Sequence, residues 1–255
     1  KMLKHKYSVF IFFVLLAILF FTKAGILFYV LLFLSFLAIT TWGAFDIRLN
    51  YFTKAICKSN ATNKKNIAIT FDDGPHEKTP EILDVLMKYN AKATFFCIGK
   101  QIEKHPEILK RILNEGHIIG NHSYSHSKWN GFFSTQKIVS EIEQTNTLVS
   151  QLVNKKMRLF RPPFGVTNPN IARAVVKTNQ IVIGWNIRSL DTVIESENAI
   201  LNRIKNRVKP GGIILLHDTS AKTVSVLEQL LLFLQSEGYQ TVTIEELLEI
   251  SAYEN

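Results

Sequence analysis

From Asn66 onward, short apolar segments of β-forming residues alternate about seven times with segments of helical periodicity. Strands that are apolar throughout are buried on both faces, and the amphipathic helices between them supply the cover. The pattern therefore predicts an α/β fold whose parallel sheet is either open or closed into a barrel. The expected strands lie at 67–71, 93–99, 117–121, 158–163, 181–187 and 212–218, with one more short strand near the carboxyl end.

Two apolar segments precede the α/β pattern, at residues 8–21 and 24–45. A helix needs roughly 20 apolar residues to span a bilayer, so the second segment is long enough and the first is short. No small-residue cleavage motif ends the first segment, which favours its retention. A tight hairpin of two membrane helices and a signal-like segment followed by one anchor both remain open. We expect residues 1–45 to form the membrane anchor, 46–63 a connector and 64–255 the catalytic-size domain.

The net charge of +9 is shared between the anchor and the domain, because residues 1–50 hold five Lys or Arg and a single Asp. No run of five or more basic residues occurs, which argues against nucleic acid as a partner. Basic residues flank the apolar segments at 1–6 and 48–58. The positive-inside tendency alone would place both flanks in the cytoplasm. The sequence carries no signature of an oligomeric state.

Polar residues gather where the expected strands end. In parallel α/β folds the carboxyl ends of the strands form the edge at which functional sites are built. Five such ends carry polar or ionisable side chains that can bind a ligand or take part in catalysis, so the sequence predicts one site at this edge. These residues are Asp72 and Asp73, Asn121 and His122, Arg161, Asp191, and His217 and Asp218.

Asp72 and Asp73 are adjacent carboxylates, and neighbours on a regular strand face opposite sides. They can share one site only where the strand breaks, and the following Gly74-Pro75 supplies a break; a solvated turn is the simpler interpretation of this motif alone. His122 and His126 are four residues apart, and on one helical turn both imidazoles project to the same side, as a metal pair requires. Two His and one carboxylate suit zinc, cobalt, nickel or iron.

Five stretches in this order resemble the motifs of the polysaccharide deacetylases, the NodB-homology family of carbohydrate esterase family 4. They are TFDDGP (70–75), HSYSH (122–126), RPPFG (161–165), the stretch that ends in Asp191, and LLHD (215–218). The resemblance covers roughly residues 64–250. It implies a distorted (β/α) barrel and a metal-dependent hydrolase that removes acetyl groups from N-acetylated sugars of a polymer, such as peptidoglycan or a chitin-like chain.

The resemblance also implies a division of roles. Asp73, His122 and His126 would hold the metal, most simply zinc, with cobalt or nickel as alternatives. Asp72 would be the general base that takes a proton from water, because two carboxylates that both bound the metal would leave no base. Arg161 would hold Asp72 ionised and oriented, since a guanidinium keeps its charge.

By the same resemblance, His217 would be the general acid that protonates the leaving amine, and Asp191 would pair with it and keep the imidazolium available. The backbone N–H near Phe164 would help to stabilise the oxyanion. Trp185, Leu215 and Phe164 would line an acetyl pocket or stack on a sugar face, although an aromatic residue in such a strand is as often part of the core.

One position departs from the family pattern: the fourth motif usually carries an Asp where this chain has Arg188. If this change reaches the substrate groove, the sugar preference shifts. Two other functions compete with the deacetylase, namely a non-catalytic carbohydrate-binding relative and an esterase or amidase that acts on O-acetyl xylan or a small amide. The polymer substrate argues for a cell-membrane protein with an extracytoplasmic domain. The basic residues that flank the apolar segments weakly favour the cytoplasmic side instead.

Overall fold

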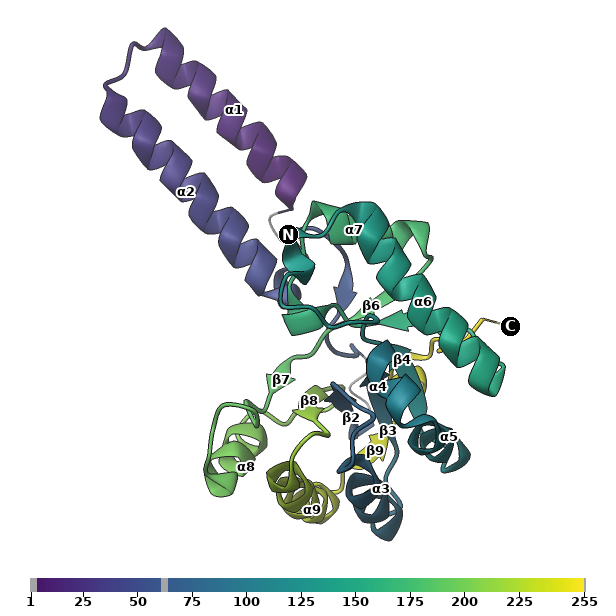
Figure 1. The fold of residues 1–255 in the computed structure, drawn as a ribbon. Coiled ribbons are helices and arrows are strands. Elements are labelled where there is room, and N and C mark those ends of the chain that lie inside the picture. The colour runs from purple at the N-terminus through teal and green to yellow at the C-terminus, as the bar shows by residue number, and fades with distance from the viewer. Residues whose placement is uncertain (1–3, 61–63, 255) are drawn as a thin grey trace.

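The computed structural model describes residues 4–60 and 64–254, and it comprises a helical hairpin and an α/β body (Figure 1). The start of the expected anchor with Lys1, the end of the expected connector at 61–63 and the last residue of the expected domain lie outside the described residues.

The body is built on a parallel sheet that curves into a half-barrel. Eight strands follow the order β1-β6-β5-β4-β3-β2-β8-β7, and β9 pairs with β2 at its amino end. Among the described residues no ladder joins the edge strands β1 and β7, so the barrel is open there. The strands are β1 (Ala55–Ile56), β2 (Asn66–Asp72), β3 (Ala93–Cys97), β4 (Ile118–Asn121), β5 (Leu159–Phe160), β6 (Ile181–Ile183), β7 (Ile187–Arg188), β8 (Ile213–His217) and β9 (Gln240–Val242).

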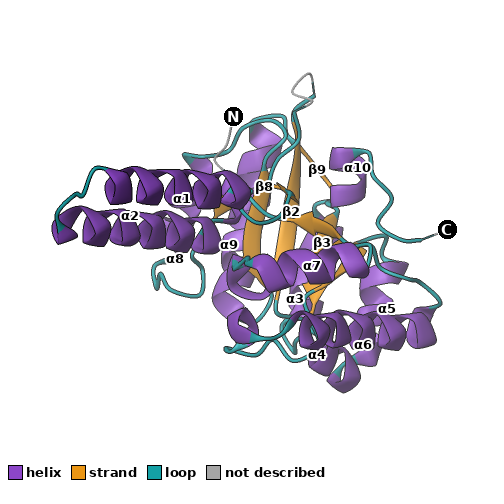
Figure 2. Ribbon diagram, turned by 90° about the horizontal axis from the view of Figure 1, so that it is seen from above, coloured by secondary structure: helices purple, strands orange, loops and turns teal. Residues whose placement is uncertain are grey.

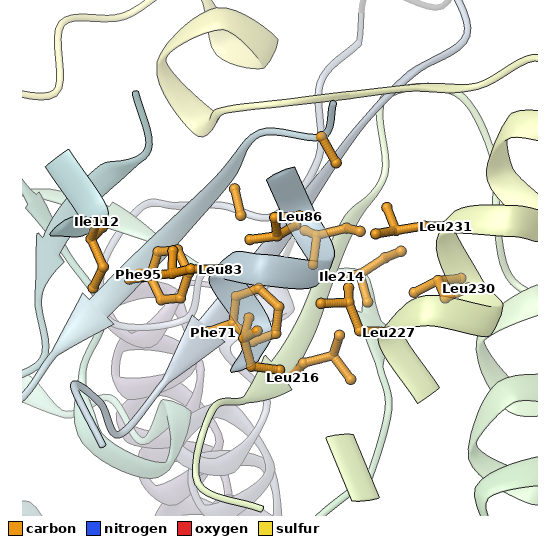
Figure 3. Close-up of a cluster of buried hydrophobic side chains, with 14 of the residues drawn as sticks. Phe71, Leu83, Leu86, Phe95, Ile112, Ile214, Leu216, Leu227, Leu230 and Leu231 are labelled. Atoms are coloured by element: carbon orange, nitrogen blue, oxygen red, sulfur yellow. The ribbon is translucent and has the colours of Figure 1, made fainter. Parts of the chain in front are cut away.

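Alternation along β2 sets which side chains face the barrel interior. Ile67, Ile69 and Phe71 pack outward in a hydrophobic cluster with the covering helices, as Figure 3 shows for Phe71. Successive side chains on a strand face opposite sides, so Thr70 and Asp72 point into the barrel. The last inward side chain of this central strand is therefore a carboxylate.

Helices surround the strands on the outer side (Figure 2). Leucines from α3 and α9, including Leu83, Leu86, Leu227 and Leu230, meet the outward face of the sheet (Figure 3). The helices of the body are α3 (Thr79–Lys88), α4 (Gly99–Lys104), α5 (Pro106–Asn114), α6 (Thr135–Val153), α7 (Pro169–Lys177), α8 (Glu197–Lys205), α9 (Ala221–Ser236) and α10 (Ile244–Leu248), with 3₁₀ turns η1 (Ile47–Leu49), η2 (Asn130–Phe132) and η3 (Pro163–Gly165).

The predicted α/β barrel-like fold is confirmed, with two differences in its strands. The segment 181–187 forms two strands instead of one, because the chain leaves the sheet at Gly184 and Trp185 and then pairs on the other edge as β7. In addition, the segment expected to be a connector contributes β1, which pairs with β6. Both differences concern two- or three-residue strands, whose pairing depends on distant parts of the chain.

The two amino-terminal segments form an antiparallel hairpin of α1 (His5–Phe21) and α2 (Ile26–Phe45) that projects from the body (Figure 1). The side chains of both helices are mostly exposed and apolar. In the described part of the chain, α2 is the helix that is long and apolar enough to cross a membrane, whereas α1 has 17 residues. The start of α1 and the end of α2 both lie against the body, so the body sits at the open end of the hairpin, opposite its loop.

Candidate functional site

The register of the sheet brings the polar strand ends together. Asp72 at the end of β2 lies directly beside His217 at the end of β8 and beside Phe96 of β3. Asn121 ends β4, and its backbone carbonyl accepts a hydrogen bond from the N–H of Arg161, one residue beyond β5. The predicted convergence of strand ends is thus present in the structure.

Arg161 anchors Asp72 inside the barrel. Its guanidinium is fully buried, stacks over the Phe96 ring with 4.0 Å between Cζ and the ring centroid, and donates from Nη1 to Asp72 Oδ1 at 2.7 Å. It also donates to Thr70 Oγ1 and to the carbonyl oxygens of Ile183 and Gly184. A buried guanidinium keeps its charge and its planar geometry, so Asp72 is held in one orientation beside a positive charge.

Asp73 turns toward the same side as Asp72 because the strand breaks at that residue. Its φ of 76° lies in the left-handed region, which reverses the alternation of side chains. Asp73 Oδ1 lies 3.5 Å from Nε2 of His122 and 3.4 Å from Nε2 of His126. This oxygen is buried without a hydrogen-bond partner among the described residues, which is costly unless a cation binds there.

The two histidines converge through an irregular turn, so the expectation that they share one helical turn is wrong. The chain after β4 is non-helical, and Ser123 and His126 both have positive φ, at 65° and 46°. The imidazole rings nevertheless lie 4.8 Å apart. Four-residue spacing brought them together by a tight reversal instead of by helical periodicity.

Three polar residues build this turn: Asn121, which the sequence placed at a strand end, and Ser123 and Glu141, to which it gave no role. Asn121 Oδ1 accepts from the Ser123 N–H, and Ser123 Oγ accepts from the His126 N–H. Glu141, buried on α6, accepts from both the N–H and the hydroxyl of Ser125, at 2.7 and 2.8 Å. Glu141 lies on the same helical face as the buried Ile138, Ile142 and Thr145, and an acid in a buried stripe is the signal that points to it.

The donor set fits a divalent transition metal. Ligands about 2.0–2.1 Å from a tetrahedral zinc ion are about 3.3–3.4 Å apart, close to the two separations measured at Asp73. The ligand atoms of Asp73, His122 and His126 all lie within 4.8 Å of one another. Nδ1 of His122 donates to the Arg161 carbonyl at 2.7 Å, which leaves the Nε2 lone pair toward Asp73.

The electrostatics of the three residues also favour a cation. Burial lowers the pKa of His122, but the charges of Asp72 and Asp73 more than offset this and raise it. Burial and the neighbouring His122 lower the pKa of His126 to about 4, so its imidazole is neutral at pH 7 and able to bind a metal. The site therefore attracts positive charge while it keeps a neutral nitrogen ligand.

His217 and Asp191 form a second pair on the opposite side of Asp72. His217 Nδ1 donates to Asp191 Oδ1 at 2.8 Å, and Asp191 is held by the His217 N–H, Ser189 Oγ and Thr223 Oγ1. Burial lowers the pKa of His217, but the hydrogen bond and charge of Asp191 raise it overall to about 9. The imidazole is thus protonated at neutral pH, and Nε2 is the nitrogen left for proton transfer.

Asp218 is a further buried residue whose role the sequence did not reveal. Its Oδ2 accepts from Thr79 Oγ1 at 2.6 Å, and burial raises its pKa to about 7. A Cβ on Gly74 would collide with the Asp218 carboxyl group, so only glycine fits between Asp73 and this side chain. Asp218 supports the turn that places Asp73.

Phe164, Trp185 and Leu215 surround the site to different extents. Phe164 is exposed in η3 with a φ of 60°, and its ring lies 4.6 Å from that of His126. Trp185 is buried beneath Gly165, where a Cβ would overlap its ring. Leu215 points inward on β8 beside Thr70 and Arg188. Phe164 is therefore the accessible one of the three.

Residues 59–182 match the sequence model of the polysaccharide deacetylase family. A peptidoglycan-N-acetylglucosamine deacetylase of Bacillus cereus is 35% identical over 198 residues, which cover 76% of this chain and 72% of the relative. The chain belongs to the polysaccharide deacetylase family. Membership of this NodB-homology family, carbohydrate esterase family 4, makes the chain a deacetylase, and members of the family depend on a metal.

Other polysaccharide deacetylases show the same likeness. The deacetylase PgdA of Listeria monocytogenes is 35% identical over 188 residues, and the match spans only 40% of that longer protein. The crystal structure of the peptidoglycan N-acetylglucosamine deacetylase Bc1960 superposes with a TM-score of 0.73 at 33% identity, covering 78% of this chain and 94% of that one. The half-barrel is therefore the fold of this deacetylase family.

Proposed function

We propose that this deacetylase hydrolyses the N-acetyl groups of sugars in a cell-wall polymer of the peptidoglycan type. The observation that carries the proposal is the position of Asp72 between two clusters, the Asp73, His122 and His126 set and the His217–Asp191 pair. A base beside a metal site on one side and an acid on the other is what hydrolysis of an amide requires. The similar proteins supply the substrate class, since their names specify peptidoglycan.

Zinc is the proposed metal, with cobalt or nickel as alternatives, and Asp73, His122 and His126 would hold it. Such a metal lowers the pKa of water from 15.7 to roughly 7 and polarises an acyl oxygen. A carboxylate oxygen and two imidazole nitrogens are borderline ligands, which suits these ions better than calcium or magnesium.

Asp72 is proposed as the general base. Its Oδ1 is occupied by Arg161, whereas Oδ2 lies 3.8 Å from Nε2 of His122 and faces the site. A carboxylate held in one orientation takes the proton of the attacking water without reorganisation. Arg161 is a positioning residue in this scheme, because it acts through Asp72.

His217 is proposed as the general acid, with Asp191 positioning it. An amide nitrogen leaves poorly as an anion, so it must receive a proton as the C–N bond breaks. The protonated imidazole supplies that proton from Nε2. The proposed oxyanion donor is the backbone N–H near Phe164, and Trp185 and Leu215 are proposed to shape the acetyl pocket beside it.

Acetate release from N-acetylglucosamine oligomers tests this function against its alternatives. We expect release that is abolished by a chelator and restored by zinc, cobalt or nickel. A carbohydrate-binding relative without turnover would bind the oligomers and release nothing. An esterase would instead release acetate faster from O-acetyl xylan than from N-acetylglucosamine oligomers, and a small-amide hydrolase would prefer acetamide derivatives.

The hairpin of α1 and α2 is proposed to anchor the enzyme in the cell membrane with the body outside the cytoplasm. Its exposed apolar helices and the length of α2 support the anchor, and the peptidoglycan relatives support the outside placement. The basic flanks argue for the other orientation. Protease added to intact cells is expected to digest the body; protection of the body until the cells are lysed would contradict the outside placement.

A further inference from the structure

The loop that carries Phe164 is bonded to the end of the helix proposed to span the membrane. The N–H of Thr167 donates to the carbonyl of Ala44 at 2.9 Å, and its hydroxyl to the carbonyl of Gly43 at 3.5 Å. The last carbonyl groups of a helix have no partner within the helix, so Thr167 caps α2. Thr167 is buried, which makes this a packed joint.

Tyr51 locks the other side of the joint. Its ring lies against Gly43 so closely that a Cβ there would overlap it, and its backbone carbonyl accepts from the N–H of His5 at the start of α1. Both helix ends are thus fixed to the body near the start of α7, as Figure 1 shows. The hairpin and the body are held together at two points instead of being joined by a loose linker.

This joint limits how far the site can stand above the bilayer. Thr167 is three positions after Phe164, and this stretch spans at most about 10 Å. The Phe164 ring lies 4.6 Å from the ring of His126. Counting the Thr167–Ala44 hydrogen bond and the length of the Phe164 side chain as well, the His126 ring is within about 22 Å of the end of α2. The headgroup layer on each side of a bilayer is about 5–8 Å thick.

Exposed aromatic side chains lie on the same side of the body. Trp129 and Phe132 are 58% and 83% exposed, and they flank Gly131, whose carbonyl accepts from Asn168 Nδ2 at 2.7 Å. Asn168 directly follows Thr167, so this turn adjoins the end of α2. Trp and Tyr gather at membrane interfaces because one part of the ring is apolar and the other polar, and exposed Phe adds apolar area.

Basic residues complete this surface. Lys128 is exposed beside the Trp129 ring, and Lys4, Lys6 and Lys54 are exposed near the open end of the hairpin. Cations next to aromatic residues bind anionic lipid headgroups. We define the interfacial surface as Trp42, Phe45, Lys128, Trp129 and Phe132.

We propose that the interfacial surface rests in the lipid headgroup layer and that the site acts on N-acetylated sugars carried on a membrane lipid. This inference rests on the proposed membrane anchor and deacetylase function. A sugar attached to a lipid headgroup lies within the distance from the membrane that the joint allows for the site. Polymer segments close to the membrane are also within reach, but the lipid-carried sugar is always held near the site, so it is the favoured substrate.

The position of the surface is tested on the full chain in vesicles of phosphatidylethanolamine and phosphatidylglycerol. The emission of Trp129 is obtained by subtracting the fluorescence of the Trp129→Phe variant from that of the unchanged protein. We expect lipids with a headgroup nitroxide to quench this emission more than lipids with a mid-chain nitroxide. Unquenched Trp129 emission in a chain that floats with the vesicles would overturn the surface while leaving the anchor intact; a chain that does not float would refute both.

The substrate is tested with N-acetylchitotriose coupled to phosphatidylethanolamine in the same vesicles, against free N-acetylchitotriose. Enzyme and substrate on one surface share a high effective concentration, so we expect kcat/KM to be at least about tenfold higher for the coupled sugar. Equal values, or faster release from isolated peptidoglycan, would overturn the inference. Acetate release from none of these substrates would refute the deacetylase function instead.

A matched pair of variants separates the surface from general effects. The double variant Trp129→Ser with Phe132→Ser is expected to lower severalfold the ratio of kcat/KM for the lipid-coupled sugar to kcat/KM for the free sugar. Met87→Ser also replaces an exposed apolar residue, on α3 far from the hairpin, and is expected to leave the ratio unchanged. Equal ratios in the double variant and the control would refute the role of the two aromatic residues.

Discussion

Asp72 and His217 lie side by side across the β2–β8 ladder, each as the last residue of its strand. Parallel register thus places the proposed base and the proposed acid together without any loop. Two supporting ion pairs extend to either side, Arg161 with Asp72 and Asp191 with His217. The proposed acid and base are consequently on rigid elements, and the proposed metal ligands are on the turns that follow.

Asp72→Asn is expected to keep the metal and to lower kcat by about 10²- to 10⁴-fold, because the amide cannot take a proton. The substitution leaves the Arg161 charge buried without its partner, so the free energy of unfolding should fall by about 3–5 kcal/mol. Metal analysis and acetate release, both on protein shown to be folded by circular dichroism, check this. Normal turnover would refute the base assignment.

His126→Ala is expected to lose both metal and activity, because two ligands remain where three were present. His105→Ala, at a histidine between α4 and α5 outside the site, is the matched control and should retain both. Bound zinc measured after dialysis separates the two variants. Full zinc content in His126→Ala would show that the ligand set differs from Asp73, His122 and His126.

The pH dependence of kcat/KM should show a basic limb near pH 9. His217 must be protonated to act, and its pKa of about 9 means that the imidazolium is present below that pH and lost as the pH rises through it. Asp191→Asn removes the largest of the interactions that raise the pKa, although the charges of Asp72 and Asp73 still raise it and burial still lowers it. The limb should then move to lower pH; a limb that stays near 9 would exclude His217 as its source.

Glu141→Gln is expected to weaken zinc binding about 10- to 100-fold, with kcat at saturating zinc little changed. Glu141 holds the turn between the two histidines through Ser125 and also pairs with Lys137 at 3.0 Å. The exposed Glu143 on the same helix offers Glu143→Gln as a control. Zinc titrations that do not distinguish the two variants would assign Glu141 no part in positioning the ligands.

Sequence reasoning located the site because chemistry at strand ends depends on local pattern. The parallel strands at 67–71 and 212–218 were visible as apolar runs, whereas the register between them is seen only in the folded chain. The turn at His122 was predicted as helical because spacing alone does not distinguish a helical turn from a reversal with positive φ. The two-residue strands β1 and β7 carry too little pattern of their own to be recognised as separate strands.

The supporting residues were less visible because their roles depend on contacts between distant segments. Asp218 meets Gly74 and Thr79, which are about 140 positions earlier in the chain. Thr167 meets the end of α2 across a similar separation. No periodicity or motif in one segment encodes such a contact, so it becomes apparent only in the folded chain.

Gly74→Ala tests whether the turn after Asp73 controls the metal site. A Cβ at this position would collide with the Asp218 carboxyl group, so either the turn or Asp218 must move. Overpacking of this kind costs about 1–3 kcal/mol of unfolding free energy, and a displaced Asp73 should weaken zinc binding at the same time. Gly25→Ala, in the hairpin loop where a Cβ meets nothing within 4 Å, is the control for both measurements. A destabilised variant with unchanged zinc affinity would show that Asp218 yields and that the Asp73 carboxylate keeps its place.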